Sequence, residues 1–452
     1  MKLSLKEALD DLNVIAIVGG SPVKGKIGNT ILENIVKSGF QGKIYVINPK
    51  YSEVLGFKSY GSLKELPEAP DAVVVAIPAS MAVQLVGEAV EVGVKLAVII
   101  SSGFSEVGRS DLQEALEEII RASDIRVIGP NSAGVFISRY SLHASIEFPP
   151  TKGKVGVAAQ SGAVGGVVIS ELKRYSSGAS FFVSLGNSLD VSVEEVLEYS
   201  SEDEGTEAVI TYLEWLRDGK RFIEGGLKLL RTGKPLCILK GGVDKRSSEA
   251  ARSHTGGLTP NFEVFKAAVS KVGGYLATDI PDAVEVCELS RRCKDLNPSR
   301  VLVLTNSGGL GVLTASNLEL QGFELPRPPR DLTNMLRDYN LQAEPVNPID
   351  LGGDTYIEEL TDLLLLDMLK EYYDVVVLAY VPTAAESPDK IAGTINNKAK
   401  DFSLPVIGYF AGEGSVDVIT RVSGDIPVAT SSWFLSRALA FIREFNSRRR
   451  LV

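Results

Sequence analysis

Short apolar runs alternate with longer amphipathic stretches over the N-terminal part of the chain. The apolar runs are the predicted strands Val14–Val18, Ile44–Ile47, Ala72–Ile77, Leu96–Ile100 and Arg126–Ile128. The amphipathic stretches have apolar residues at helical spacing and are the predicted helices Ile31–Ser38, Met81–Val92 and Asp111–Ala122. Strands that alternate with helices form parallel βαβ units, with helices on both faces of the sheet. This pattern predicts a doubly wound, Rossmann-like domain.

The same alternation recurs twice further along the chain. After the punctuating Pro149–Gly153, a second set has predicted strands Val155–Ala159, Ser180–Val183, Ala208–Tyr212 and Leu236–Leu239 and ends in a predicted helix, Pro281–Arg292. A third set has predicted strands Val301–Leu304, Val375–Tyr380 and Pro405–Phe410. Because both sets repeat one order, we expect two flavodoxin-like domains of one topology. The predicted fold is α/β, with three doubly wound domains at residues 1–131, 132–296 and 297–452.

Composition narrows the class of protein. The chain has 452 residues, of which 44% are hydrophobic and 23% charged, as in ordinary globular domains. A net charge of −10 argues against a nucleic-acid surface. The charged N-terminus does not resemble a signal peptide, and no apolar run approaches the ~20 residues of a membrane span. We expect a cytoplasmic protein with no bound metal, since three cysteines and two histidines lack metal-ligand spacing.

The loop Gly19–Gly28 joins a predicted strand to a predicted helix, where a helix N-terminus can bind phosphate. It departs from a P-loop because Ile27 replaces the hydroxyl residue that holds magnesium, and it lacks the GxGxxG spacing of an NAD site. The second strand ends in Asn48-Pro49-Lys50, where an NAD site usually has a carboxylate. Together with Lys24 and Lys26, Lys50 favours a polyphosphorylated cofactor other than NAD. The alternative is a tight turn with solvated lysines.

Further strand ends carry small or hydroxyl-bearing residues. In the first domain these are Ile77-Pro78, Ser101-Ser102-Gly103 and Gly129-Pro130-Asn131, which would line the ligand crevice at the carboxyl edge of the sheet. In the second domain they are Gln160-Ser161-Gly162-Ala163 and Ser184-Leu185-Gly186-Asn187, with Asp190 shortly after. Two such helix N-termini could hold a dianion between them without positive side chains. Turns that bind no ligand are the alternative.

His254 is the candidate nucleophile. It lies in Arg252-Ser253-His254-Thr255-Gly256-Gly257, whose small neighbours leave the imidazole accessible. Histidine is largely neutral at pH 7, so a ring nitrogen can attack phosphorus. Glu214 ends an apolar strand and could hydrogen-bond the other ring nitrogen, which would fix the tautomer. The alternatives are a surface histidine in a glycine-rich turn and an ordinary edge carboxylate.

Taken together, these motifs resemble the NDP-forming acyl-CoA synthetase superfamily, which includes the succinyl-CoA synthetases. The resemblance is greatest to the separate α subunits of ADP-forming acetyl-CoA synthetases and runs through essentially the whole chain. Its most specific parts are Ser253–Gly257, Gln160–Ala163, Ser184–Asn187 and Asn48–Lys50. Succinyl-type α subunits end after two domains, whereas this chain carries a third.

The resemblance implies roles for the candidate residues. His254 would be transiently phosphorylated, with Glu214 at its ring. The phosphate would be bound by Gln160, Ser161, Gly162, Ala163, Gly186 and Asn187. Coenzyme A would be bound by Gly20, Ser21, Pro22, Lys24, Lys26, Asn48, Pro49 and Lys50, and its path toward the thioester would be lined by Ile77, Pro78, Ser101, Ser102, Gly103 and Asn131.

The resemblance also implies a reaction and a partner. An acyl-CoA, acetyl-CoA by default, would react reversibly with phosphate and ADP to give the acid, ATP and CoA through an acyl phosphate and phosphohistidine. The Mg²⁺-bound nucleotide would lie on a β subunit with an ATP-grasp fold, in an α2β2 heterotetramer. The main alternative is a non-catalytic protein that senses acyl-CoA. The CoA-binding half of a protein acetyltransferase and an NAD-dependent dehydrogenase fit the residues less well.

Overall fold

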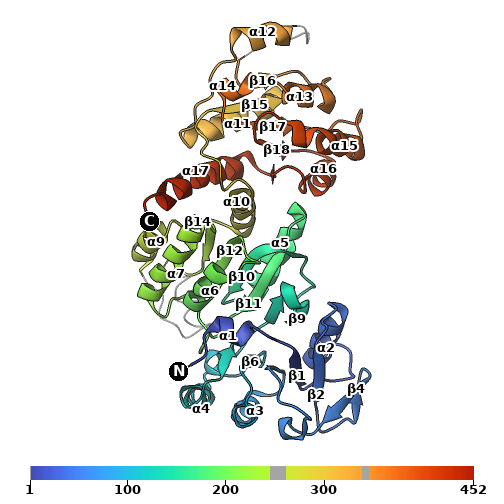
Figure 1. The fold of residues 1–452 in the computed structure, drawn as a ribbon, viewed down its shortest axis with the longest axis vertical. Helices are drawn as coiled ribbons and strands as arrows, with labels where there is room; N and C mark the ends of the chain where they lie inside the picture. Colours follow the sequence, from blue (N-terminus) through green and yellow to red (C-terminus); the bar gives the residue numbers. More distant parts are fainter. Residues whose placement is uncertain (1, 245–260, 338–345) are drawn as a thin grey trace. The chain divides into compact units, whose positions relative to one another are not determined.

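The computed structural model describes residues 2–244, 261–337 and 346–452, and the chain forms two compact units (Figure 1). Unit 1 comprises Met1–Ser170 and Gly178–Ile280, and unit 2 comprises Glu171–Ser177 and Pro281–Val452. Unit 1 contains two sheets and unit 2 contains one. The division into three domains at residues 131/132 and 296/297 stays a prediction.

The first sheet of unit 1 runs in the order β3-β4-β2-β1-β5-β6-β7. Its strands are β1 (Val14–Val18), β2 (Lys43–Ile47), β3 (Glu53–Val54), β4 (Phe57–Tyr60), β5 (Ala72–Val75), β6 (Leu96–Ile99) and β7 (Arg126–Ile128). The five predicted strands are β2, β1, β5, β6 and β7, all paired in parallel. The short antiparallel pair β3–β4 was not predicted, because its residues are mostly polar.

Helices cover both faces of this sheet, as the pattern predicts. They are α2 (Ile27–Lys37), α3 (Ala79–Glu91) and α4 (Ser110–Arg121). On β1, Ala16 and Val18 pack in one cluster with buried residues of α3 and α4, whereas Ile15 and Ile17 pack in another with α2. Successive strand residues point to opposite faces, so a strand buried on both faces is continuously apolar. The predicted doubly wound fold is confirmed.

The second sheet of unit 1 runs in the order β14-β13-β12-β10-β11-β8-β9. Its strands are β8 (Gly134–Ile137), β9 (Leu142–Ser145), β10 (Lys152–Ala159), β11 (Ala179–Ser184), β12 (Ala208–Leu213), β13 (Leu236–Lys240) and β14 (Tyr275–Ala277). Its described helices are α5 (Gly162–Leu172), α6 (Val193–Glu202), α7 (Gly219–Thr232) and α9 (Phe262–Lys271). The hairpin β8–β9, which pairs antiparallel to β11, was not predicted.

The sheet of unit 2 runs in the order β16-β15-β17-β18-β19. Its strands are β15 (Val301–Thr305), β16 (Ile349–Asp350), β17 (Val375–Tyr380), β18 (Val406–Phe410) and β19 (Val428–Ala429). Its helices are α10 (Ile280–Arg292), α11 (Gly308–Leu320), α12 (Arg330–Leu336), α13 (Ile357–Leu363), α14 (Leu369–Tyr372), α15 (Pro388–Lys398), α16 (Ser415–Val422) and α17 (Ser432–Arg449). The parallel strands β11-β10-β12-β13-β14 of the second sheet have the same order, so the predicted shared topology is confirmed.

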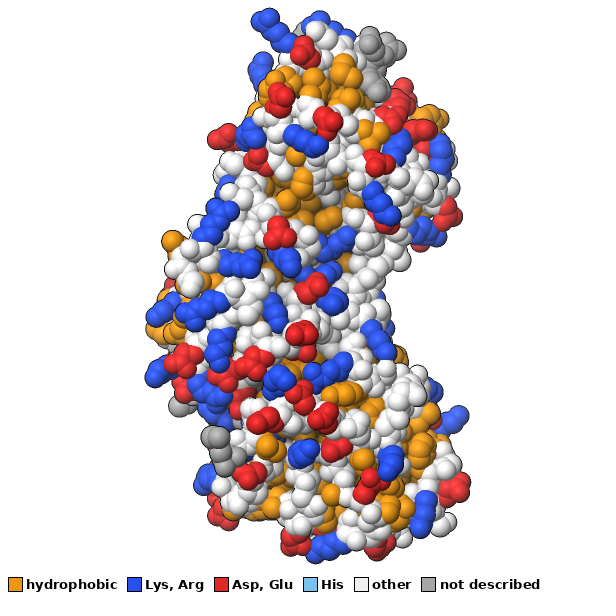
Figure 2. Space-filling model, in the orientation of Figure 1, with side chains coloured by type: hydrophobic (Ala, Val, Ile, Leu, Met, Phe, Trp, Pro, Cys, Tyr) orange, Lys and Arg blue, Asp and Glu red, His pale blue; other side chains and the backbone are white. Residues whose placement is uncertain are grey.

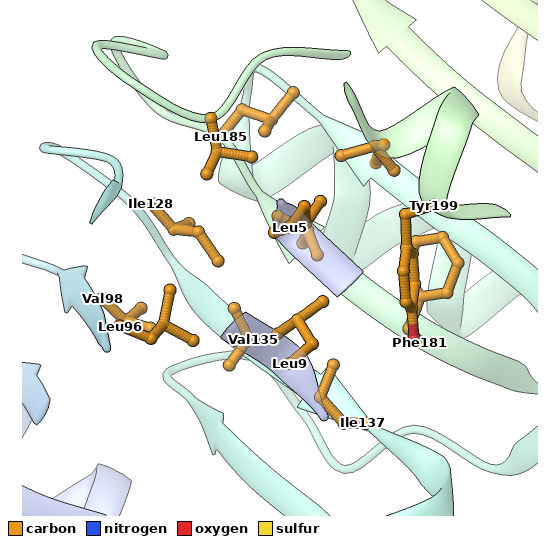
Figure 3. Packing of buried hydrophobic residues seen from close by; sticks show 14 of the residues in the cluster. Leu5, Leu9, Leu96, Val98, Ile128, Val135, Ile137, Phe181, Leu185 and Tyr199 are labelled. Carbon is orange, nitrogen blue, oxygen red and sulfur yellow. The ribbon is translucent and has the colours of Figure 1, made fainter. Parts of the chain in front are cut away.

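One hydrophobic core runs through both sheets of unit 1. The N-terminal helix α1 (Leu5–Leu9) begins with a capping box between Ser4 and Glu7. Its buried Leu5 and Leu9 belong to one cluster with strand residues of both sheets, drawn in Figure 3. These strand residues include Leu96, Val98 and Ile128 of the first sheet and Val135, Ile137 and Phe181 of the second. The shared core fixes the carboxyl ends of the two sheets relative to each other.

A buried ion cluster reinforces that junction. The side chain of Arg126 on β7 is only 3% exposed and donates to Asp190 (2.9 Å) and to Glu195 (2.8 Å). Asp190 also accepts from the backbone N–H of Val127 (2.8 Å) and from Lys2 (2.5 Å). Burial alone would raise the pKa of Asp190, but Arg126 and the other donors hold it below its ordinary value. The loop between β11 and α6 is thereby tied to the first sheet.

Unit 2 includes a short segment that interrupts unit 1 in the sequence. In this segment, the Tyr175 hydroxyl donates to Glu285 (2.9 Å) and the Ser177 hydroxyl donates to Glu288 (2.6 Å), both on α10. Glu285 also accepts from the backbone N–H and hydroxyl of Thr430. Complete burial raises the pKa of Glu285 to about 7. Residues 171–177 are therefore anchored in unit 2 by buried hydrogen bonds.

Surface and helix composition add two observations. On the face drawn in Figure 2, acidic and basic side chains are interspersed. Within the described residues, no helix has both the length and the apolar character that a membrane crossing requires.

The Arg126 cluster generates a stability prediction. Arg126→Met would leave Asp190 and Glu195 as buried carboxylates without their main cation, and we expect a loss of about 3–5 kcal/mol in unfolding free energy. The matched control is Arg121→Met, because Arg121 pairs with Glu117 from a 73% exposed position outside the cluster and should cost less than ~1 kcal/mol. Urea denaturation of both variants measures the difference, and equal costs would contradict the assigned role.

Candidate active site

The second sheet of unit 1 changes winding direction between β10 and β12, and Gln160 joins the ends of these two strands. Its side-chain carbonyl accepts from the backbone N–H groups of Glu214 (2.6 Å) and Trp215 (3.1 Å). Its side-chain amide donates to the carbonyl of Trp215 (3.0 Å). In doubly wound sheets, ligands bind at such a switch point, beyond the carboxyl ends of the strands. Gln160 therefore holds the Glu214 segment in place at the edge where a ligand is expected.

Glu214 has one carboxylate oxygen without a protein partner. Oε1 accepts from the Tyr212 hydroxyl (3.1 Å), and burial together with Glu214 raises the pKa of Tyr212, so that the hydroxyl stays a donor. Oε2 is buried and accepts no hydrogen bond from any residue that the structure describes. An unpaired buried carboxylate oxygen is costly, so it marks a position where a donor is expected.

Lys240 contacts the backbone of Glu214. Its ammonium group donates to the backbone carbonyl of Glu214 (2.8 Å) and lies over the ring of Phe265. Burial lowers the pKa of Lys240 to about 8, an effect that Glu214 partly opposes. Hydrogen bonds with the side chains of Gln160 and Lys240 thus both hold the backbone at the end of β12.

The turn after β11 interlocks with the end of the first sheet. Gly186 has a φ of +53°, and a Cβ there would collide with the carbonyl oxygens of Pro130 and Asn131. The backbone N–H of Asn187 donates to Pro130 O (2.9 Å). The hydroxyl of Ser132 donates to Ser184 O (2.6 Å). Only glycine fits at position 186, and the interlock places this turn beside Asn131.

These elements surround a cleft of about 820 Å³ in unit 1. The predicted site residues in its wall are Ser102, Asn131, Gln160, Ser161, Gly162, Ala163, Gly186, Asn187 and Glu214. Other wall residues are Ile27, Ile100, Ser132, Ala133, Ile146, Glu147, Tyr212, Gly241 and Gly242. The cleft therefore brings together both predicted phosphate turns, Glu214 and part of the predicted CoA path. The Ser161 turn leads directly into α5, but α6 begins only at Val193, so the prediction that the Asn187 turn lies at a helix N-terminus was wrong.

The predicted cofactor loops lie at the carboxyl edge of the first sheet. The Asn48 amide donates to Gly20 O (2.7 Å), and the Asn29 amide donates to Ser21 O (3.0 Å). The first bond connects the loop after β2 with the loop after β1, and the second connects α2 with the loop after β1. Lys24, Lys26 and Lys50 are exposed. The predicted cofactor residues of these loops are absent from the wall of the 820 Å³ cleft, which the first loop reaches only with Ile27.

Not every predicted polar residue faces the cleft. The Ser101 hydroxyl donates to Ile77 O (2.5 Å) and so joins the ends of β6 and β5, whereas the neighbouring Ser102 lines the cleft. Ile77, Pro78 and Gly103 are absent from the cleft wall. Asp190, which follows the second phosphate turn, belongs to the Arg126 cluster instead.

Sequence reasoning missed Tyr212 and Glu147. Tyr212 precedes Glu214 by two residues on one strand, and this spacing places both side chains on the same face. That signal could have identified it. Glu147 follows the unpredicted hairpin, and burial raises its pKa. His254 lies outside the described residues.

Two family models match the chain. One describes a CoA binding domain and matches residues 13–138, and the other describes a succinyl-CoA ligase-like flavodoxin domain and matches residues 152–290. The two matches together contain every predicted site residue of this chain.

Three relatives extend the comparison. The chain is 31% identical to subunit alpha of the ADP-forming acetate–CoA ligase I of Pyrococcus furiosus, over 92% of each protein. It is 32% identical to the ADP-forming acetate–CoA ligase I of Archaeoglobus fulgidus, over 92% of this chain but only 60% of that protein's length. A solved structure of the dinucleotide-forming acetyl-coenzyme A synthetase 1 of Ca. Korarchaeum cryptofilum, in complex with phosphate and ADP, superposes with a TM-score of 0.86 at 28% identity. That match covers 97% of this chain and 96% of the other.

The Gln160 clamp generates a prediction. Gln160→Leu would leave two backbone N–H groups and one carbonyl at the cleft without partners, and we expect it to lower the unfolding free energy by about 2–4 kcal/mol. Gln41→Leu is the control, because Gln41 is exposed and should change stability by less than ~0.5 kcal/mol. Urea denaturation compares the two variants. A Gln160→Leu protein as stable as its control would show that the clamp contributes nothing.

Proposed function

Since this chain belongs to the family of ADP-forming acetate–CoA ligase α subunits, we propose that it catalyses the acyl-transfer and phosphohistidine steps of that reaction. The proposed overall reaction converts acyl-CoA, phosphate and ADP reversibly into the carboxylic acid, ATP and CoA. Acetyl-CoA is the proposed acyl substrate, by analogy with the acetate–CoA ligases of Archaeoglobus fulgidus and Pyrococcus furiosus.

The observation that carries the proposal is the buried Oε2 of Glu214, which has no hydrogen-bond partner among the described residues. It lies in a cleft whose wall also contains Ser161 and Asn187 of the two phosphate turns. A carboxylate acceptor of this kind suits the N–H of an imidazole whose other nitrogen carries a phosphoryl group. The only other histidine of the sequence, His143, is buried in β9, so we assign the phosphorylated residue as His254.

The proposed CoA site extends from the cleft along the carboxyl edge of the first sheet. We assign Gly20, Ser21, Pro22, Lys24, Lys26, Asn48, Pro49 and Lys50 to the nucleotide end of CoA. Ile77, Pro78, Ser101, Ser102, Gly103 and Asn131 are assigned to the path toward the thioester. The exposed lysines supply positive charge, and the presence of Ser102 and Asn131 in the cleft wall supports a path that ends beside the phosphate turns.

The proposed chemistry begins with phosphate held by the Ser161 and Asn187 turns. A phosphate oxygen attacks the thioester carbonyl carbon, the C–S bond breaks, and CoA leaves as the thiolate. A ring nitrogen of His254 then attacks phosphorus, and the carboxylate leaves. Glu214 accepts the other ring N–H and stabilises the positive charge that develops on the imidazole. Phosphoryl transfer depends mainly on positioning and charge stabilisation, which backbone-lined turns can provide.

The final transfer to ADP requires a second site. We place ADP, ATP and Mg²⁺ on a partner β subunit with an ATP-grasp fold, in an α2β2 assembly. The name of the Pyrococcus relative, a subunit alpha, supports a partner. Within residues 2–244, 261–337 and 346–452, no three His, Cys, Asp or Glu side chains converge to hold a metal ion. Cytoplasmic localisation is part of the proposal, since CoA and ADP are intracellular metabolites.

The phosphohistidine is tested by labelling. The purified chain, with its co-purified partner subunit, is incubated with acetyl-CoA and radiolabelled phosphate. We expect acid-labile, base-stable label on the wild-type chain and none on His254→Ala. His143→Gln is the control and should keep the label, because His143 is only 1% exposed.

Glu214→Gln extends the same experiment. The amide can no longer stabilise the imidazolium as a charge, so label should appear about 100-fold more slowly while CoA affinity is unchanged. Equal labelling of wild-type and His254→Ala would refute the proposed reaction. The absence of label from a wild-type chain that binds CoA tightly would refute it as well and would favour an acyl-CoA sensor.

Lys50 tests the orientation of CoA. It follows the second strand, where a doubly wound fold contacts the ribose, so we expect Lys50→Ala to weaken CoA binding about five- to tenfold. Binding of 3′-dephospho-CoA should not change, because it lacks the phosphate that Lys50 would contact. Lys37→Ala, at the far end of α2 from the cofactor loop, is the control. Calorimetry measures all affinities, and an equal loss for both ligands would contradict this placement.

A further inference from the structure

Glu106 connects the predicted CoA path with the predicted phosphate turn. It lies in the short helix Ser105–Val107, directly after the Ser101–Phe104 loop. Its Oε1 accepts from the backbone N–H groups of Gly103 (2.5 Å) and Phe104 (3.1 Å). Its Oε2 accepts from the side-chain amide of Asn187 (2.7 Å). One carboxylate thus contacts the CoA-side loop with one oxygen and the phosphate-side turn with the other.

The charge of Glu106 determines the direction of these hydrogen bonds. Burial alone would raise the pKa of Glu106, but the donors from Asn187, Gly103 and Phe104 hold it below its ordinary value. An ionised carboxylate can only accept hydrogen bonds. Asn187 must therefore turn its NH₂ group toward Glu106, and its carbonyl oxygen points the other way.

The orientation of the Asn187 side-chain amide in turn sets the orientation of the Asn131 side-chain amide. The Asn131 side-chain NH₂ lies 3.4 Å from the carbonyl oxygen of Asn187, so Asn131 is the donor in this contact. The backbones of both residues are fixed independently, since Asn131 N–H donates to Ser101 O and Asn187 N–H donates to Pro130 O. The Glu106 carboxylate therefore determines whether the NH₂ group or the carbonyl oxygen of each side-chain amide faces the cleft. Asn131 and Asn187 both line that cleft.

We propose that Glu106 is a positioning residue for the phosphate and acyl phosphate: it orients the Asn187 and Asn131 amides through a directed chain of hydrogen bonds. The inference rests on the proposed function, because it names the groups that this chain serves. With both orientations fixed, each asparagine keeps one side-chain N–H that donates to none of the described residues and can donate to a phosphate oxygen. The Asn131 side-chain oxygen likewise accepts from none of the described residues and can accept from a ligand. Groups oriented before the substrate binds need no reorganisation during reaction.

Glu106→Gln separates orientation from loop support. The carbonyl of the new glutamine can still accept from Gly103 and Phe104, so CoA affinity should stay within about twofold. Its NH₂ group would face Asn187, which must flip its own amide and then meet Asn131 donor to donor. We expect the KM for phosphate to rise about tenfold or more and kcat to fall, since a hydrogen bond to a charged group is lost.

Two further variants complete the test. Glu106→Ala removes both connections, so the affinity for CoA and the affinity for phosphate should both fall. Glu118→Gln, at an exposed position on α4 of the same sheet, removes a charge without breaking such a contact and should leave both ligands and kcat unchanged. Thermal unfolding confirms folding, and the Ala variant still tests the connection if the Gln variant is unstable.

The outcomes are distinct from those of the proposed function. If the wild-type chain shows phosphohistidine label but Glu106→Gln has an unchanged KM for phosphate, the orienting role is wrong while the reaction stands. A fall in CoA and phosphate affinity to the same extent in Glu106→Gln would also overturn it, because a general structural defect would then explain both. If the wild-type chain forms no phosphohistidine, the reaction itself is refuted first.

Discussion

The site depends on the attachment of one loop, the connection from β11 to α6, to the neighbouring sheet. Arg126 accomplishes this from a fully buried position, with Asp190 and Glu195 as its partners. Removing such charges from water costs several kcal/mol, and only good geometry with further hydrogen bonds offsets that cost. The backbone N–H of Val127 and the ammonium of Lys2 supply those bonds to Asp190. Asp190 follows Asn187 in the same loop, so these ion pairs hold the loop that carries Asn187 against the first sheet.

Around this anchor, the cleft is arranged with few charged groups. Gln160, Ser184 and Ser132 satisfy backbone groups within the protein, so that the edges of both sheets hold their position before any ligand binds. Glu214 has one carboxylate oxygen without a hydrogen-bond partner among the described residues, at the point where the two halves of the second sheet diverge. The wall of the cleft consists mainly of turns, amides and apolar residues.

The sequence predicts the central strands well because each is a continuous apolar run, which only a strand buried on both faces requires. Val14–Val18 and Val375–Tyr380 match to the residue. The hairpin β8–β9 was not predicted because its second strand, Leu142–Ser145, mixes apolar and polar residues and forms no continuous apolar run. Among site residues, the turns at Ser161 and Asn187, which line the cleft, follow from the rule that ligands bind at strand ends. No local pattern separates Ser101, whose hydroxyl bonds within the protein, from Ser102, and none connects Glu106 with Asn187 across 81 positions.

The short segment 171–177 has a consequence for the architecture of the whole chain. The polypeptide passes from unit 1 to unit 2 at residue 171, returns at residue 178 and leaves again at residue 281. The two units are therefore joined by three chain crossings, and cleavage at one position would not separate them. A chain shortened at residue 280 would keep Tyr175 and Ser177 but lose Glu285 and Glu288, the carboxylates that accept from them. A version of this protein with only two sheets would need different residues in the 171–177 segment, because Tyr175 and Ser177 depend on hydrogen-bond acceptors in unit 2.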